Sequence, residues 1–160
     1  MIHIITGEGK GKTTSAVGMA VRAVGNGMNV IFVQFLKGMD SGEVKALKSL
    51  NIKVERVENI KDFDYKNIPY LKEKQDEMLK NAFLADSDML ILDEVLVAYN
   101  NDYITKSLLT ELMDNYKGEL VLTGRGACKE ILEKAEYISE IKFVKHPYEE
   151  GIEARKGIEY

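Results

Sequence analysis

The run Ile4-Ile5-Thr6-Gly7-Glu8-Gly9-Lys10-Gly11-Lys12-Thr13-Thr14 decides how this chain folds. An apolar stretch typical of a buried strand stops in three alternating glycines. Because glycine has no Cβ, the backbone there can turn tightly and direct successive amide N–H groups toward an anion. Lys12 adds a positive charge, and Thr13 and Thr14 begin a helix whose N-terminal amides attract the same anion. The stretch therefore predicts a strand, a phosphate-binding loop and a helix, with a polyphosphate as ligand.

The loop departs from the usual P-loop spacing by one residue. The usual pattern has four residues between its first glycine and the Gly-Lys-Thr ending, whereas three separate Gly7 from Gly11. A tight glycine turn without a ligand is the alternative, and Glu8 brings a negative charge that opposes anion binding. The Lys-Thr-Thr ending favours phosphate binding. The residues expected to contact the nucleotide are Gly7, Glu8, Gly9, Lys10, Gly11, Lys12, Thr13 and Thr14.

Composition limits the range of functions. A chain of 160 residues that is 45% hydrophobic fits one domain, residues 1–160, around one core. The net charge of −4 comes from interspersed charges, so neither nucleic acid nor an anionic membrane is an expected partner. Cys128 is the only cysteine, which excludes an internal disulfide and fits a reducing compartment. With no apolar run near the ~20 residues that span a bilayer and no signal-peptide pattern, we expect a cytoplasmic protein.

Apolar strands alternate with amphipathic helices along the chain. A strand over 1–6, a helix over 13–26 and a strand over 30–35 predict a parallel pair with a right-handed crossover. Further strands are expected over 53–57, 89–94, 120–123 and 141–145, with helices over 43–50, from Pro69, over 105–115 and over 127–135. The predicted fold is α/β, a P-loop NTPase-like and mostly parallel sheet with helices on both faces.

An acidic pair ends the strand over 89–94. In P-loop proteins such a strand runs beside the first one, so that its terminal acid meets the Mg²⁺ held by the loop threonine. We therefore expect Thr13, Asp93 and Glu94 to bind a metal ion. A helix cap or a turn is the alternative for the two acids.

Two basic residues follow other strands at the same predicted edge of the sheet. Lys37 lies in a loop after the strand over 30–35, where open α/β sheets bind ligands; an ordinary surface loop is the alternative. Arg125 stands between Gly124 and Gly126, where its planar guanidinium can bind phosphate oxygens. A surface ion pair is the alternative for Arg125. Phe63 and Tyr65 lie in a polar stretch over 58–67, where packing onto the domain competes with a ligand role.

Several motifs in order resemble the ATP:corrinoid adenosyltransferases of the CobA/CobO/BtuR type, and the likeness covers nearly the whole chain. The matching motifs are Gly9-Lys10-Gly11-Lys12-Thr13-Thr14, Gln34-Phe35-Leu36-Lys37-Gly38, Leu92-Asp93-Glu94, Thr123-Gly124-Arg125-Gly126, Val144-Lys145-His146-Pro147-Tyr148 with Gly151-Ile152, and Lys156-Gly157-Ile158-Glu159-Tyr160. Physics alone would make the segment after residue 145 an irregular terminus, so its likeness to the family is informative. The family's short P-loop is similar to this one.

The resemblance implies transfer of the 5′-deoxyadenosyl group of ATP to a reduced corrinoid, with Mg²⁺ as cofactor and triphosphate as product. It implies that Lys12, with Arg125, stabilises the departing triphosphate. Phe63 and Tyr65 stand where a family pair, Phe-x-Trp, displaces the lower axial ligand of cobalt. A flavoprotein reductant and a homodimer are also implied. The chain departs in having Tyr65 for tryptophan and Glu8 for the usual asparagine, and it lacks the segment that precedes the first strand in many relatives.

Two other functions stay open at this point. The loop alone suggests an ATPase or a small-molecule kinase, and a non-catalytic nucleotide- or corrinoid-binding relative is the second alternative. The sequence offers no Ser/His/Asp or Cys/His set. Because Co(I) in a corrinoid is itself a strong nucleophile, adenosyl transfer needs no protein base.

Overall fold

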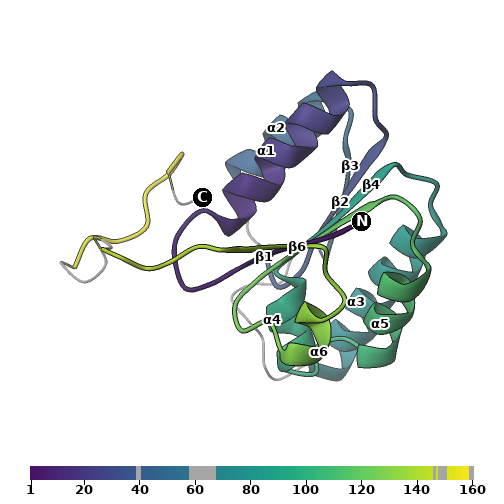
Figure 1. Cartoon of the computed structure of the whole chain (residues 1–160). Helices are drawn as coiled ribbons and strands as arrows, with labels where there is room; N and C mark the ends of the chain where they lie inside the picture. Colours follow the sequence, from purple (N-terminus) through teal and green to yellow (C-terminus); the bar gives the residue numbers. More distant parts are fainter. Residues whose placement is uncertain (39–40, 58–67, 146, 148–150, 159–160) are drawn as a thin grey trace.

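The structure is a computed structural model that describes residues 1–38, 41–57, 68–145, 147 and 151–158. The described strands form one parallel sheet in the order β3-β2-β4-β5-β1-β6 (Figure 1). Their bounds are β1 Ile2–Thr6, β2 Val30–Gln34, β3 Lys53–Arg56, β4 Met89–Asp93, β5 Glu119–Thr123 and β6 Tyr137–Glu140. The predicted α/β fold is confirmed, and every strand pair within the described residues is parallel.

Helices cover both faces of the sheet, as predicted (Figure 1). One face carries α1 (Lys12–Gly25) and α2 (Gly42–Ser49). The other carries α3 (Ile68–Leu84), α4 (Val95–Asn100), α5 (Lys106–Asn115) and α6 (Lys129–Leu132). Among the described residues, no helix is both long and apolar enough to cross a membrane.

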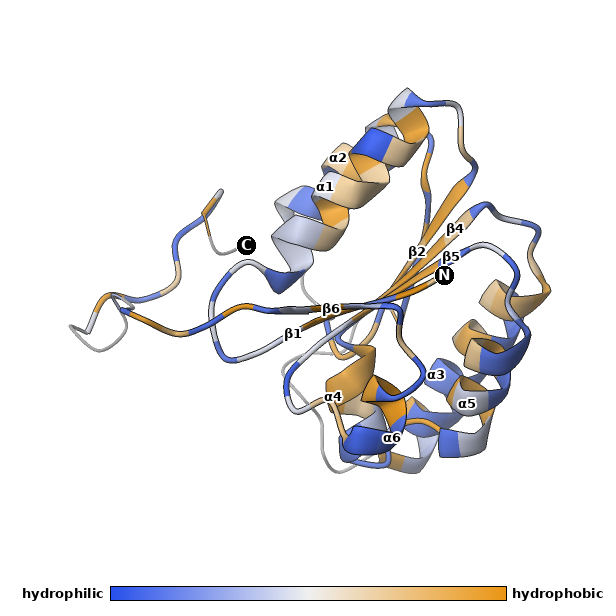
Figure 2. Cartoon of the chain, in the orientation of Figure 1, coloured by the Kyte–Doolittle hydropathy of each residue, from blue (hydrophilic) through white to orange (hydrophobic). Residues whose placement is uncertain are grey.

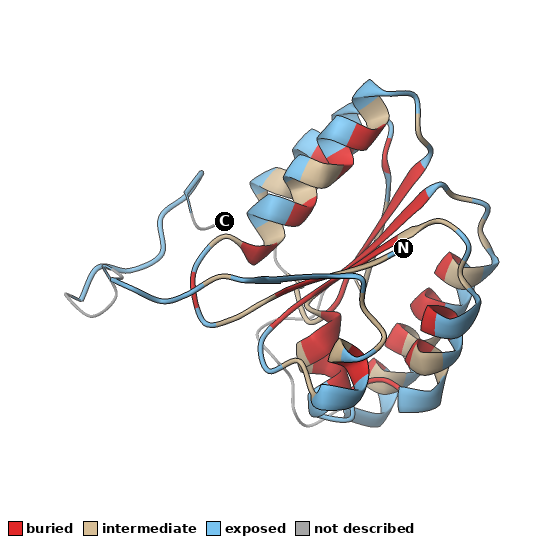
Figure 3. Cartoon of the chain, viewed as in Figure 1, coloured by how far each residue is buried: buried red, intermediate tan, exposed pale blue. Residues whose placement is uncertain are grey.

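The core consists of two apolar layers, one on each face of the sheet. Successive strand side chains point to opposite faces, so in β4 Met89 and Ile91 belong to one layer and Leu90 and Leu92 to the other. The central strands are therefore largely apolar (Figure 2) and buried (Figure 3), with polar residues where they end. Ala16, Ala20 and Ala23 form the buried stripe of α1, and their small size lets this helix lie close to the sheet.

The last strand differs from the prediction. Instead of a strand over 141–145, β6 spans Tyr137–Glu140 at the edge of the sheet beside β1. All four of its side chains are exposed, so the strand lacks the apolar pattern by which strands are recognised. Residues 141–145 continue past the phosphate loop without strand structure. The helix expected over 127–135 is also shorter, and α4 was not predicted.

The position of β4 differs as well. We expected β4 to run beside β1, but β5 lies between them. β5 ends in Thr123, which is paired in register with Ile5 of β1. Because Thr123 is small, the start of α1 still reaches Asp93 across the end of β5, through a hydrogen bond from Thr13.

Candidate nucleotide and metal site

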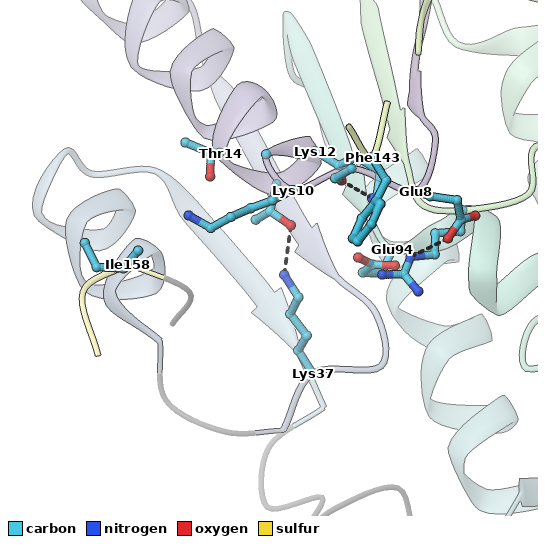
Figure 4. Close-up of a pocket in the computed structure, with 12 residues that line it drawn as sticks. Glu8, Lys10, Lys12, Thr14, Lys37, Glu94, Phe143 and Ile158 are labelled. Carbon is cyan, nitrogen blue, oxygen red and sulfur yellow. Dashed lines mark hydrogen bonds and ion pairs between the residues drawn. The ribbon is translucent and has the colours of Figure 1, made fainter. Parts of the chain in front are cut away.

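The carboxyl ends of the strands surround a pocket of about 520 Å³ (Figure 4). The loop between β1 and α1 forms one side, and residues that follow β2, β4, β5 and β6 form the rest. The lining consists of Glu8, Gly9, Lys10, Gly11, Lys12, Thr13, Thr14, Lys37, Glu94, Arg125, Phe143 and Ile158. The structure therefore brings together most of the predicted site residues that it describes.

The loop requires glycines for two reasons, which are positive φ angles and close contact with the segment after β6. Gly7 and Gly11 have φ values of 103° and 119°, which residues with a Cβ rarely adopt. At Gly9 an added Cβ would lie 2.6 Å from the carbonyl oxygen of Lys142. The amide of Gly9 donates a 2.8 Å hydrogen bond to the Ile141 carbonyl. The segment after β6 thus occupies one of the loop amides expected to face the anion.

Lys12 is held beneath the loop. Its Nζ donates hydrogen bonds of 2.8 Å to the carbonyl oxygens of Gly7 and Gly9, and the side chain is buried. Burial lowers the pKa of the Lys12 ammonium, and the negative charge of Glu94 opposes this shift. The sequence indicated a positive charge at Lys12. The structure shows that this ammonium is fixed by carbonyl groups of the loop, whose amides would also contact a phosphate.

Asp93 is the buried centre of the polar network. Its side chain has no exposed surface, and its Oδ1 accepts hydrogen bonds from the hydroxyls of Thr13 at 2.9 Å and Thr123 at 2.7 Å. Its Oδ2 accepts from Lys37 Nζ at 2.8 Å and from Gln34 Nε2 at 3.4 Å. A buried carboxylate needs such partners, because removing an unpaired charge from water is costly. The predicted pairing of Thr13 with the acid after β4 is thus made by Asp93.

Glu94 lies at a turn between β4 and α4. Its φ of 60° is left-handed, and its amide donates a 3.0 Å hydrogen bond to the Thr123 hydroxyl. Burial raises the pKa of the Glu94 carboxyl, and the charge of Asp93 raises it further, while Lys37 and Lys12 oppose the shift. A cation bound in the pocket would stabilise the ionised form of this carboxylate.

Arg125 forms an ion pair across the mouth of the pocket. Its Nε lies 3.4 Å from a carboxylate oxygen of Glu8, and both side chains are more than half exposed. The alternative considered for Arg125, a surface ion pair, is therefore present in the structure. Both residues still line the pocket, so an anion that enters meets Arg125 already paired with Glu8.

The chain is similar to known proteins along its whole length. The family model for ATP:corrinoid adenosyltransferase BtuR/CobO/CobP matches residues 1–160. The chain belongs to this family. The corrinoid adenosyltransferase of Escherichia coli K12 is 35% identical over 167 residues, which cover 100% of this chain and 85% of that protein. Corrinoid adenosyltransferase CobA of Salmonella typhimurium is 33% identical over 171 residues, with the same coverage. The corrinoid adenosyltransferase of Pseudomonas aeruginosa is 34% identical over 169 residues, covering 82% of its length.

The oxygen donors of this ATP:corrinoid adenosyltransferase suit Mg²⁺. Within the described part of the chain, no group of three or more His, Cys, Asp or Glu side chains could hold a metal. Mg²⁺ does not require one, because it commonly binds one or two carboxylates together with substrate phosphates and water. The Thr13 hydroxyl beside the Asp93 carboxylate, with Glu94 lining the same pocket, fits that pattern.

The sequence did not predict a role for some residues of the site, and other predicted residues lie outside the part of the chain that the structure describes. Phe63 and Tyr65 lie outside the described residues, as does the whole stretch over 58–67 that contains them. Thr123 and Gln34 were noted only within motifs that match the family and were given no role, although each is a polar residue that ends an apolar strand. Ile158 was noted only within a motif that matches the family, and Phe143 only within the strand expected over 141–145. Both line the pocket.

Proposed function

We propose that the described pocket binds ATP so that the 5′-deoxyadenosyl group passes to the Co(I) centre of a corrinoid and triphosphate leaves. Family membership supports the reaction. The observation that supports the site assignment is the hydrogen bond from Thr13 to the buried Asp93, which brings a hydroxyl and a carboxylate together beside the glycine loop and the start of a helix. Nothing in the comparisons favours an ATPase or a kinase.

The substrates supply the covalent chemistry. The electron pair of Co(I) forms the bond to C5′, the C5′–O bond breaks, and its electrons leave with the triphosphate. Cobalt changes formally from Co(I) to alkyl-Co(III), so no external oxidant is needed. The protein is left with two tasks, which are to align cobalt with C5′ and to stabilise the negative charge of the leaving group.

Four basic residues, Lys37 among them, line the proposed triphosphate site. Lys12 is fixed below the loop carbonyls, while Lys10 and Arg125 lie at its exposed side. The N-terminal end of α1 adds the amides of the first helical turn, which favour an anion. We infer that Gly7 to Thr14 and Lys37 bind the phosphates, with Lys12 and Arg125 acting on the leaving group.

Thr13, Asp93 and Glu94 would hold Mg²⁺. When bound, Mg²⁺ neutralises part of the triphosphate charge and so makes it a better leaving group. The carboxylates would supply hard oxygen ligands, and the phosphates would supply others.

For the corrinoid, we propose Phe63 and Tyr65 as the residues that displace the lower axial ligand. The support is their match to the family's aromatic pair. Replacing both with alanine should slow adenosylation of a corrinoid with a lower ligand far more than that of one without it. Equal losses with both substrates, or a collapse of the melting temperature, would favour a packing role.

The remaining partners follow from the family resemblance. We infer a separate flavoprotein as the electron donor and a homodimer as the working assembly. The exposed apolar side chains of Tyr137 and Ile138 on edge strand β6 support an interface there. The cytoplasmic location stays a prediction.

The proposed function is tested with Mg-ATP and a chemically reduced corrinoid. The visible spectrum should change to that of an alkyl-corrinoid, and light should reverse the change because the cobalt–carbon bond is photolabile. Asp93→Asn should abolish this product, while Asp114→Asn, an exposed aspartate on α5 far from the pocket lining, should leave it unchanged. If the protein binds both ligands but makes no such product, a non-catalytic role follows.

A further inference from the structure

The ammonium of Lys37 lies between two of the three proposed metal ligands, Thr13 and Asp93. Its Nζ is 2.9 Å from the Thr13 hydroxyl oxygen and 2.8 Å from Asp93 Oδ2. A third oxygen, Oε1 of Glu43, lies 3.8 Å away. Figure 4 shows the Lys37 side chain extending from the loop after β2 toward the start of α1.

These oxygens are the kind that Mg²⁺ prefers. A lysine ammonium also binds such oxygens, but at longer distances than Mg²⁺ does. Mg²⁺ binds hydroxyl, carboxylate and phosphate oxygens at about 2.0–2.1 Å. A lysine ammonium binds the same oxygens by hydrogen bonds near 2.8 Å. The two cations cannot share the space, because like charges a few ångströms apart repel strongly in a partly buried site.

Asp93 requires a cation whether or not metal is present. Its carboxylate is completely buried, and a buried charge that loses its partner is strongly destabilising. In this structure Lys37 is the partner of Oδ2, with Gln34 giving a longer hydrogen bond of 3.4 Å. The buried Asp93 carboxylate is therefore already paired with a cation from the protein itself.

Lys37 is also placed so that it can leave. Its side chain is 30% exposed, it lines the pocket, and it follows Leu36, whose φ of 56° marks a turn out of the sheet. By contrast, Lys12 is buried under the loop with two backbone carbonyl partners. Of these two lysines, only Lys37 can exchange its carboxylate partner for a phosphate in the pocket without disrupting the loop.

We propose that Lys37 is a built-in counter-cation that occupies the divalent-cation position between Thr13 and Asp93 until metal arrives with the triphosphate. The proposal rests on the proposed function only for the identity of that position. It predicts that the nucleotide-free protein binds divalent cations weakly, because Lys37 competes with them. Arrival of the triphosphate then gives the displaced ammonium a new anionic partner.

The test is a titration of the nucleotide-free full-length chain with Mn²⁺, followed by the electron paramagnetic resonance signal of the free ion. Lys37→Met should bind Mn²⁺ at least about tenfold more tightly than the unmodified protein, because the competitor is gone. Lys37→Arg keeps the positive charge and should bind Mn²⁺ as weakly as the unmodified protein. If the methionine variant does not fold, Lys37→Gln replaces it in the same titration.

Melting temperatures give an independent measurement. In a chelator, Lys37→Met should melt below the unmodified protein, and Mg²⁺ at constant ionic strength should restore most of the loss. The double variant Lys37→Met/Asp93→Asn should lose both the tighter Mn²⁺ binding and the response to Mg²⁺. A permanent structural ion pair would lower the melting temperature without any gain in metal binding.

Equal Mn²⁺ affinities of the Lys37→Met variant and the unmodified protein would overturn the proposal, as would tight Mn²⁺ binding that survives in the double variant. Neither titration contains ATP or a corrinoid. If the protein shows this metal response but makes no adenosyl product, the role of Lys37 stands and the proposed reaction is overturned. If it makes the product but lacks the metal response, the reaction stands and the role of Lys37 is overturned.

Discussion

The amide of Gly9 donates a 2.8 Å hydrogen bond to the carbonyl oxygen of Ile141, which ties the segment after β6 to the phosphate loop. Ile141 in turn donates its own amide to Thr6 at the end of β1. Phe143 of the same segment lines the pocket. The loop and residues 141–143 therefore form one structural unit at the proposed nucleotide site.

Gly9→Ala should disrupt this unit. The new Cβ would lie within 3 Å of the Lys142 carbonyl and the Ile141 side chain, so the loop and the segment must separate. We expect a cost of about 1–3 kcal/mol in the free energy of unfolding, with weaker ATP binding. Gly18→Ala is the control, because it lies in α1 with nothing near its Cβ and should stabilise the helix by about 0.5–1 kcal/mol. Equal stabilities of the two variants in urea denaturation would contradict the packing argument.

Lys12→Ala should weaken ATP binding strongly while leaving the secondary structure intact. The ammonium is fixed where the loop phosphates would bind, and a hydrogen bond to a charged group contributes about 1.5–3 kcal/mol, or roughly a 10- to 150-fold loss of affinity. Isothermal titration calorimetry measures the affinity and circular dichroism the fold. Lys45→Ala, on the exposed side of α2, is the matched control and should bind ATP normally. Unchanged ATP affinity in Lys12→Ala would remove the loop from the site.

Glu8→Asn should bind ATP more tightly. The change removes a negative charge from an anion site and frees Arg125, which lies 3.4 Å from Glu8. We expect about a three- to tenfold gain in affinity that shrinks at high salt, because exposed charges are screened. The melting temperature should barely change, since an exposed ion pair contributes at most about 1 kcal/mol. In Arg125→Gln, the same Glu8 change should give a smaller gain, and a full gain there would show that Arg125 is not involved.

Glu136→Gln tests a pH-dependent contact at the start of β6. A carboxylate oxygen of Glu136 accepts a 2.6 Å hydrogen bond from the Ile2 amide, which lowers the pKa of Glu136 in the folded state. A lowered pKa stabilises the fold at pH values above the ordinary carboxyl value of 4.5, and this contribution disappears as the pH falls through the folded-state pKa. The variant should therefore melt below the unmodified protein at pH 7 and match it in strong acid. Glu111→Gln, exposed on α5, is the control. A difference that persists in strong acid would assign the effect to packing.

The sequence predicted the parts of the fold whose side chains are buried in a regular pattern. The strands before and after α1 are apolar runs, and the alanine stripe of α1 has helical spacing. The pattern failed where burial is unusual. β6 lies at the sheet edge with exposed side chains, and α4 is a six-residue helix whose Val95, Leu96, Ala98 and Tyr99 are all buried, so it has no polar face to reveal its period.

The site was predictable only as far as its motifs extend. The loop and the acid pair have recognisable spacing, and the structure joins Thr13 to Asp93 by a hydrogen bond, whereas metal binding by these residues stays a prediction. The intervening β5 and the hydroxyl of Thr123 depend on strand order, which the sequence does not specify. The contact of Lys37 with Thr13 and Asp93 joins three separate segments, and no local pattern indicates it.

The most direct test of the proposed reaction is the identity of the phosphate product. With Mg-ATP and a chemically reduced corrinoid, ³¹P NMR should show intact triphosphate formed in equal amount to the adenosyl-corrinoid, because the bond that breaks is C5′–O. An ATPase or a kinase would break a phosphoanhydride bond and release ADP. Formation of ADP that does not depend on the corrinoid, with no triphosphate, would contradict the account.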